Sequence, residues 1–194
     1  MSDKDRQSCW PGCRKDGIMS EVGIILGSDS DLPELSQCFG ILEKFGISFE
    51  VKVSSAHRTP EATKEWVSSA RSRGIRIIIA AAGGAAHLPG VVASYTTLPV
   101  IGIPMATNLS GGIDSLLSIV QMPAGIPVGT MAAGKSGGAN AALYAASILA
   151  LSNETYQKKL EEYRKEMADG VQQKNDTLQK TGYKSYIELM KGAK

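Results

Sequence analysis

Short apolar runs recur along this chain and alternate with segments whose apolar residues are spaced as in helices. The runs predict strands at 22–26, 75–82, 99–103 and 128–131, and alternating apolar and polar residues predict a further strand at 48–53. The segments between them predict helices at 33–45, 60–74, 87–95, 113–120 and 138–151. Apolar runs without alternation are typical of parallel strands buried on both faces. Strand–helix–strand units with right-handed crossovers therefore predict an α/β fold of three layers, a doubly wound parallel sheet between two layers of helices.

The 194 residues suit a single domain with a sizeable core. We expect a polar, disordered leader at 1–20, an α/β catalytic domain at 21–152 and a C-terminal helical tail at 153–194. The tail carries an apolar stripe on a charged helix, formed by Tyr156, Leu160, Tyr163 and Met167. A helix of this kind packs either on a neighbouring subunit or on its own core, and the sequence alone leaves both open.

Charge and composition exclude several classes of function. The net charge is +2 and no basic stripe is present, so neither nucleic acid nor a membrane surface is expected as a partner. No apolar run reaches the roughly 18 residues that span a bilayer. Three cysteines are few and odd in number, and we expect a cytoplasmic protein. Two histidines thirty residues apart, without clustered cysteines or carboxylates, predict no metal site.

In parallel α/β sheets the ligand binds beyond the carboxyl ends of the strands, so the loops at those ends carry the functional prediction. The first such loop is Gly-Ser-Asp-Ser-Asp at 27–31. Ser28 and Ser30 can donate hydrogen bonds, Asp31 can accept them from sugar hydroxyls, and the following helix N-terminus can bind an anion. The loop has no nucleotide-binding glycine signature. The alternative interpretation is a simple helix N-cap.

The second loop, at 54–60, places a histidine and an arginine between small residues, on a bend fixed by a proline. Ser55 and Ala56 leave room for a ligand. His57 is the natural general acid and base, since imidazole titrates near neutral pH. Arg58 can donate two parallel hydrogen bonds to a phosphate. We therefore predict a phosphorylated small molecule and proton-transfer chemistry at His57.

The third loop, at 82–90, is almost free of side chains. Gly83, Gly84 and Ala85 allow backbone N–H groups to approach a ligand closely. We expect His87 to cap or orient this loop rather than to catalyse. A further glycine-rich stretch at 134–138 lacks the order of a phosphate loop, and we expect it to pack closely at a subunit contact or over the ligand.

Four uncommon stretches occur in one order. They are Gly-Ser-Asp-Ser-Asp (27–31), Ser-Ala-His-Arg-Thr-Pro (55–60), Ala-Gly-Gly-Ala-Ala-His-Leu-Pro-Gly (82–90) and Asp-Ser-Leu-Leu-Ser-Ile-Val-Gln-Met-Pro (114–123). Together they resemble the bacterial-type (PurE, class I) family of N5-carboxyaminoimidazole ribonucleotide mutases. The resemblance extends over about residues 21–151.

The resemblance implies a flavodoxin-like fold, a homo-octamer with sites near subunit contacts, and a small ribonucleotide as substrate. It implies isomerisation of N5-carboxyaminoimidazole ribonucleotide to 4-carboxyaminoimidazole ribonucleotide in purine biosynthesis, without metal or organic cofactor. His57 matches the catalytic histidine of the family. The other residues carried over are expected to bind substrate: Ser28, Ser30, Asp31, Ser55, Ala56, Arg58, Gly83, Gly84, Ala85 and His87.

A mechanism follows as a hypothesis. Protonation of the labile carbamate nitrogen by His57 releases carbon dioxide, which a closed pocket holds beside the nucleophilic ring carbon C4. Attack by C4 forms the new carboxylate, and His57 then removes the C4 proton.

Two other functions stay open from sequence. The related animal-type enzyme carboxylates aminoimidazole ribonucleotide directly with carbon dioxide, although Arg58 and the glycine-rich third loop favour the mutase. A flavodoxin-like protein that carries flavin mononucleotide is the second alternative. No aromatic residue follows the second or third predicted strand to stack on a flavin ring.

Overall fold

The computed structural model describes residues 19–192, so most of the predicted leader lies outside the described residues. Its centre is a five-stranded parallel sheet with the order β2-β1-β3-β4-β5. The strands are β1 (Val22–Leu26), β2 (Phe49–Val53), β3 (Ile77–Ala82), β4 (Val100–Pro104) and β5 (Gly129–Thr130). This order is that of flavodoxin-like folds, in which the chain changes direction across the sheet between β1 and β3.

The three central strands β1, β3 and β4 are apolar in sequence because both of their faces are buried. Every residue of β1, β3 and β4 is buried, whereas the edge strand β2 is buried only at its first residue. Burial of one isoleucine or leucine side chain stabilises the fold by roughly 1.5–3 kcal/mol. The register pairs Leu26 with both Val53 and Ala81, and Ala82 with Pro104. The strands therefore end level, and the loops that follow them meet at one edge of the sheet.

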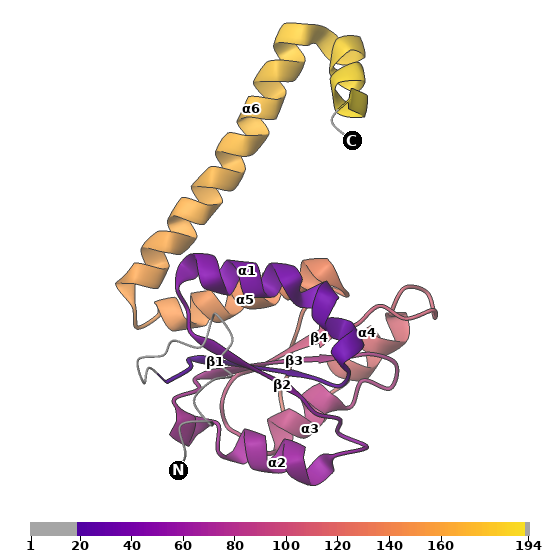
Figure 1. The fold of residues 1–194 in the computed structure, drawn as a ribbon, viewed down its shortest axis with the longest axis vertical. Coiled ribbons are helices and arrows are strands. Elements are labelled where there is room, and N and C mark those ends of the chain that lie inside the picture. The colour runs from indigo at the N-terminus through magenta and orange to yellow at the C-terminus, as the bar shows by residue number, and fades with distance from the viewer. Residues whose placement is uncertain (1–18, 193–194) are drawn as a thin grey trace, which may run out of the picture. The chain divides into compact units, whose positions relative to one another are not determined.

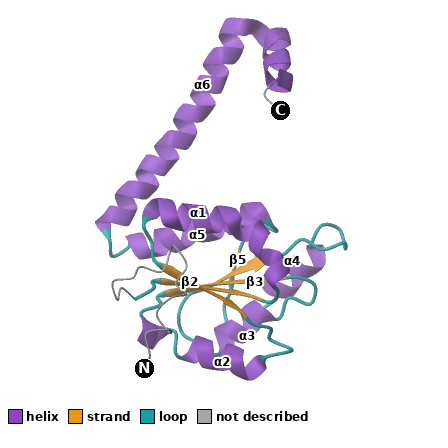
Figure 2. Ribbon diagram, in the orientation of Figure 1, coloured by secondary structure: helices purple, strands orange, loops and turns teal. Residues whose placement is uncertain are grey.

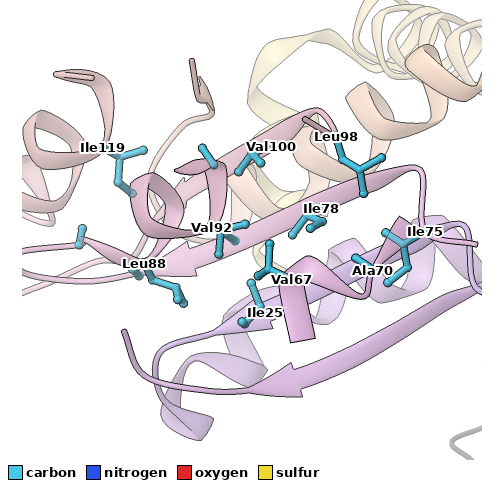
Figure 3. Packing of buried hydrophobic residues seen from close by; sticks show 14 residues of the cluster. Ile25, Val67, Ala70, Ile75, Ile78, Leu88, Val92, Leu98, Val100 and Ile119 are labelled. Carbon is cyan, nitrogen blue, oxygen red and sulfur yellow. The ribbon is translucent and has the colours of Figure 1, made fainter. Parts of the chain in front are cut away.

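Helices cover both faces of the sheet, as predicted (Figures 1 and 2). Between residues 29 and 150 the helical elements are η2 (Asp29–Leu35), α1 (Ser36–Phe45), α2 (Pro60–Ser68), η3 (Arg71–Arg73), α3 (Leu88–Ser94), α4 (Ile113–Val120) and α5 (Lys135–Ala150). Helices α1 and α5 lie on one face, and α2 and α3 on the other. Figure 3 shows the core under the second face, where Val67, Val92 and Ile119 belong to the same hydrophobic cluster as Ile78. Helix α4 thus shares the face of α2 and α3.

The helices predicted at 33–45 and 60–74 are each divided in the structure. The helix predicted at 33–45 is preceded by the 3-10 segment η2, which contains Pro33, and α1 begins only at Ser36. The helix predicted at 60–74 ends at Ser68 and is followed by the short η3. Thr59 is the N-cap residue of α2, as expected, but its side chain makes no capping bond.

The glycine-rich stretch before α5 packs within the chain. A Cβ atom on Gly137 would lie 1.7 Å from the Ala132 carbonyl oxygen, and one on Gly138 would lie 3.3 Å from Leu35. Helix α5 begins at Lys135, three residues earlier than predicted. The close packing expected of this stretch is therefore present, but it joins α5 to neighbouring segments of the same chain.

The chain forms two compact units, with the boundary between Leu149 and Ala150. The second unit contains α6 (Glu154–Gly192), which confirms a helical tail. Gly182 has φ 74° and ψ 156°, so α6 consists of two helices joined at this residue. Among the helices of residues 19–192, none combines the length and the apolar character that a membrane span requires.

Candidate active site

A cavity of about 500 Å³ lies where the loops after β1, β2, β3 and β4 meet. It is lined by Gly27, Ser28, Asp31, Ser55, Ala56, His57, Arg58, Ala82, Gly83, Ala86, His87, Leu88, Met105, Ala106 and Thr107. The position agrees with the rule that ligands of such sheets bind beyond the carboxyl ends of the strands. It agrees also with the loops singled out from sequence.

The first loop folds through its own hydroxyl and carboxylate groups. Ser28 is the N-cap of η2, and its Oγ accepts a hydrogen bond from the Ser30 N–H (3.3 Å) and lies 2.8 Å from Ser30 Oγ. The Ser30 hydroxyl also lies 3.4 Å from Asp31 Oδ1. Ser28 therefore caps the segment, as the simpler interpretation expects, and also lines the cavity, while its contact with a ligand stays a prediction.

The second loop is fixed by hydroxyl groups on both sides of its turn. Ser55 Oγ accepts from the N–H groups of His57 (3.3 Å) and Arg58 (3.2 Å). Thr59 Oγ1 accepts from the Ser55 N–H (2.9 Å) and donates to the Ser55 carbonyl (3.1 Å). These bonds define the backbone that presents His57 and Arg58. The Arg58 guanidinium lies 3.5 Å from the Gly27 carbonyl oxygen, which brings it beside the first loop.

The two histidines of the chain meet in this cavity. His57 Nε2 lies 2.7 Å from His87 Nδ1, and the two rings are edge to face at 84°, with centroids 4.9 Å apart. A contact this short is a hydrogen bond in which one imidazole donates and the other accepts. The expectation that His87 orients its own loop is thus incomplete, because its side chain contacts the proposed acid–base residue itself.

The third loop turns sharply before it reaches His87. Gly84 has φ 65° and Ala86 has φ 41°, a left-handed conformation that is uncommon for alanine. The Ala86 N–H donates to the Gly83 carbonyl (3.2 Å), which closes the turn. The Gly84 N–H donates to Ser115 Oγ (2.9 Å) at the start of α4. The turn is therefore fixed by its own backbone and by a neighbouring helix.

Two carboxyl groups near the cavity have shifted pKa values. Partial burial raises the pKa of Asp31, the hydrogen bond from Ser30 opposes this, and the carboxylates of Asp29 and Glu34 add to the rise. The hydrogen bond from Thr107 lowers the pKa of Asp114. That bond is 2.7 Å long and ties the loop after β4 to α4.

Most of the residues predicted from sequence line the cavity. Three do not belong to its lining within the described part of the chain: Ser30, Gly84 and Ala85. Ser30 contacts Ser28, and Gly84 and Ala85 lie inside the turn that places Ala86 and His87. Their contact with substrate stays a prediction.

The sequence interpretation missed the loop after β4. Met105, Ala106 and Thr107 line the cavity, whereas the stretches predicted to matter in that part of the chain are 114–123 and 134–138. The available signal was positional, since the rule on strand ends applies to the fourth strand as well as to the first three. Met-Ala-Thr has no distinctive chemistry of its own.

Between residues 19 and 192, no three His, Cys, Asp or Glu side chains are grouped so as to hold a metal ion.

Comparison with known proteins decides the family. The sequence profile described as "AIR carboxylase" matches residues 21–170, which is most of the chain and includes every residue of the cavity. This chain belongs to the AIR carboxylase family. The resemblance found in the four sequence stretches is thereby confirmed.

Curated relatives within the AIR carboxylase family are about half identical to this chain. The N5-carboxyaminoimidazole ribonucleotide mutase of Thermotoga maritima is 52% identical over 169 residues, which cover 87% of this chain and 98% of the relative. The mutase of Pyrococcus horikoshii is 51% identical over 166 residues, covering 86% and 93%. The phosphoribosylaminoimidazole carboxylase of Candida glabrata is 50% identical over 167 residues, covering 86% of this chain but 29% of that protein.

A solved structure of the family supports the fold. PurE of Treponema denticola superimposes with a TM-score of 0.74 at 26% identity, and the match covers 81% of this chain and 97% of that one. The flavodoxin-like α/β fold expected from the sequence is therefore confirmed.

Proposed function

We propose that this enzyme is an isomerase of purine biosynthesis that converts N5-carboxyaminoimidazole ribonucleotide into 4-carboxyaminoimidazole ribonucleotide. The observation that carries the proposal is one cavity in which a hydrogen-bonded histidine pair lies beside an arginine and a hydroxyl-rich loop. This arrangement occurs in a chain about half identical to curated mutases along nearly their whole length.

The first two loops hold the ribose phosphate in this proposal. Arg58 supplies the only guanidinium in the lining, and Ser28 and Ser55 supply hydroxyl groups within the same cavity. Arginine binds phosphate through two parallel hydrogen bonds, and the Asp31 carboxylate accepts bonds from ribose hydroxyls. These contacts lie away from the reacting atoms, so their binding energy orients the imidazole ring.

His57 carries both proton transfers. It first donates a proton to the N5 nitrogen of the carbamate, the bond from that nitrogen to the carboxylate carbon breaks, and carbon dioxide and aminoimidazole ribonucleotide result. The electron pair of ring carbon C4 then forms a bond to carbon dioxide. His57 removes the proton from C4, and the aromatic product is restored. One proton is given and one is recovered, so the reaction is a net isomerisation that requires no redox or organic cofactor.

His87 keeps His57 in one orientation and one tautomer. With 2.7 Å between Nε2 of His57 and Nδ1 of His87, one proton lies between the two rings. The Nδ1 atom of His57 is then the atom that exchanges a proton with substrate, while Nε2 is held by its partner. A second group that fixes the tautomer of a catalytic imidazole is a recurrent feature of acid–base sites.

The loops after β3 and β4 form the apolar part of the cavity. Ala82, Gly83, Ala86, Leu88, Met105 and Ala106 contribute backbone and small or apolar side chains. In the proposal these groups confine carbon dioxide beside C4. Confinement replaces a bimolecular encounter by an intramolecular one and gives a high effective concentration.

We infer also that the working enzyme is a homo-oligomer. Helix α4 exposes Ile113, Leu117 and Val120, which are 42%, 53% and 50% accessible and are spaced as one helical stripe. An apolar stripe of this kind is typical of a subunit contact. The octamer, the packing of the tail on a neighbouring subunit and the cytoplasmic location stay predictions. Light scattering of the full chain measures the first of them.

A second candidate is direct carboxylation of aminoimidazole ribonucleotide, because one relative with 50% identity is a carboxylase. The test supplies the full-length enzyme either with N5-carboxyaminoimidazole ribonucleotide at low bicarbonate or with aminoimidazole ribonucleotide and high bicarbonate. The proposal expects rapid product formation in the first reaction. Turnover in the second reaction alone would assign the carboxylase, and turnover in neither would refute both.

Flavin binding receives no support from the site. The cavity lining defined above contains no Phe, Tyr or Trp side chain on which a flavin ring could stack.

A further inference from the structure

The first turn of α4 contacts two loops of the cavity although none of its own residues lines it. Ser115 is completely buried and accepts the hydrogen bond from the Gly84 N–H at 2.9 Å. The adjacent Asp114 accepts a bond from Thr107 Oγ1 at 2.7 Å. Gly84 belongs to the turn after β3, and Thr107 to the loop after β4. One helical turn thus joins the two loops that the proposed mechanism uses to confine carbon dioxide.

The start of α4 is itself fixed closely against the second of these loops. Gly112 has φ 104°, and a Cβ atom at this position would lie 2.8 Å from the Met105 carbonyl oxygen. Only glycine permits both the backbone conformation and the close approach. At its other end α4 is anchored by Ile119, which is 1% accessible and belongs to the core. Ser115 therefore presents its oxygen from a rigid support.

The turn after β3 is held by its own Ala86 N–H to Gly83 carbonyl bond and by two hydroxyls of α4, of which Ser115 makes the shorter contact, at 2.9 Å against 3.5 Å for Ser118. Because Gly84 adopts a left-handed conformation and carries no side chain, its backbone has little intrinsic preference for the observed orientation. The Ser115 hydroxyl fixes the peptide group between Gly83 and Gly84. That turn then places Ala86 and His87 in the cavity, with His87 bonded to His57.

We propose that Ser115 is a positioning residue of this active site: it holds the turn after β3 so that His87 aligns His57 and the cavity keeps its shape. The proposal rests on the mutase function described above. It assigns Ser115 no contact with substrate.

The test compares Ser115→Ala with Ser115→Thr and with Ile119→Val in the full-length protein. Ser115→Ala removes the acceptor, whereas Ser115→Thr keeps a hydroxyl at the same position. Ile119→Val removes one methyl group from the same helix and lowers stability without touching Gly84. We expect Ser115→Ala to lower kcat by about fivefold, with KM changed much less, because the loss of this one hydrogen bond reaches His57 only through the turn that places His87. Ser115→Thr should recover most of kcat, and Ile119→Val should keep wild-type kcat.

Amide hydrogen exchange at Gly84 provides a second readout that does not depend on activity. The Gly84 amide should be protected in wild type and in Ile119→Val, and should exchange rapidly in Ser115→Ala. Equal kcat in Ser115→Ala and Ile119→Val at the same folded fraction would overturn the proposal. If the wild type isomerises no substrate, the proposed function fails, and the exchange measurement still decides the role of Ser115. Loss of protection confined to Ser115→Ala supports that role, and unchanged protection overturns it.

Discussion

The loops after β1 and β2 and the loops after β3 and β4 build the same cavity in different ways. The first pair contributes polar and charged side chains, among them Ser28, Asp31 and Arg58. The second pair contributes mainly backbone and apolar groups, with His87 and Thr107 as its polar side chains. The first pair stabilises itself through hydroxyls within its own segments, whereas the second pair depends on α4 for Ser115 and Asp114.

In the proposed mechanism, the loops after β1 and β2 serve mainly to bind the substrate, and the loops after β3 and β4 serve mainly the carboxyl transfer. Side chains that carry charge suit the recognition of a phosphate and a ribose, which are the same in substrate and product. A surface of backbone and small residues suits the confinement of carbon dioxide, which carries no net charge. Substitutions in the first pair of loops should therefore act mainly on KM, and substitutions in the second pair mainly on kcat. His57 is the exception, since it lies on the loop after β2 and carries the proton transfers of the proposed mechanism.

The largest effect is expected for His57→Asn. The amide keeps a polar group of similar size but cannot exchange a proton, and general acid–base catalysis contributes typically 10²–10⁴-fold. We expect kcat to fall by about that factor. The affinity for the product, measured by calorimetry, should change little. A variant that retains wild-type kcat would remove the basis of the proposed mechanism.

A smaller effect, on binding, is expected for Arg58→Ala. Hydrogen bonds to charged groups contribute about 1.5–3 kcal/mol, so KM should rise roughly 10- to 150-fold with kcat little changed. Arg71→Ala is the matched control, since Arg71 lies in η3, bonds to Thr97 and does not line the cavity. If the two variants have the same KM, Arg58 does not bind the phosphate.

His87→Leu tests the second pair of loops. It removes the bond to His57 and keeps an apolar side chain. A single hydrogen bond contributes about 1 kcal/mol, so kcat should fall about fivefold to tenfold with KM nearly constant. Steady-state kinetics over a range of pH separates the two parameters. A rise in KM without a change in kcat would place His87 among the binding residues and would break the division between the two pairs of loops.

The smallest effect is expected for the stability of Asp31→Asn. Because the folded protein raises the pKa of Asp31, it binds this proton more tightly than the unfolded chain does. The ionised carboxylate thus costs stability above its folded-state pKa, and the cost disappears at pH values below the pKa of the unfolded chain. Asp31→Asn should be more stable near neutral pH by a few tenths of a kcal/mol, at about the scale of a surface substitution.

Urea denaturation at neutral and acid pH measures this difference in the free energy of unfolding. Asp176→Asn in α6 is the control for removal of one negative charge outside the cavity. The stability difference between Asp31→Asn and wild type should be more favourable to the variant at neutral pH than at acid pH. The opposite order would contradict the predicted sign.

The same carboxylate gives a second expectation, for the KM of the wild-type enzyme. Its KM should rise as pH falls through the raised pKa of Asp31.

The sequence predicted the sheet well because the central strands are buried on both faces. Near-continuous apolar runs such as 22–26 and 75–82 leave few other interpretations. The helices were less certain at their ends, since Pro33 is tolerated in the 3-10 segment η2 and since η3 continues the helical spacing beyond Ser68. The last strand is only two residues long, too short to show a pattern of its own.

Site residues could be predicted from sequence where polar side chains directly follow a strand. They could not be predicted where the site depends on a contact between residues of different loops that the sheet brings together. His57 and Arg58 stand out by residue type. The hydrogen bond between His57 and His87 depends on the register that ends β1, β2 and β3 at one level, and no local pattern contains it. The role of Ser115 is hidden for the same reason, because its partner Gly84 lies 31 residues away in the sequence.

The most direct test of the account follows the carboxyl carbon itself. N5-carboxyaminoimidazole ribonucleotide labelled with ¹³C in its carbamate is incubated with the wild-type enzyme in an excess of unlabelled bicarbonate, and the product is analysed by mass spectrometry. Transfer within a closed cavity predicts that 4-carboxyaminoimidazole ribonucleotide retains most of the label. Product whose carboxylate carries the isotope ratio of the bicarbonate would contradict the mutase and would favour direct carboxylation.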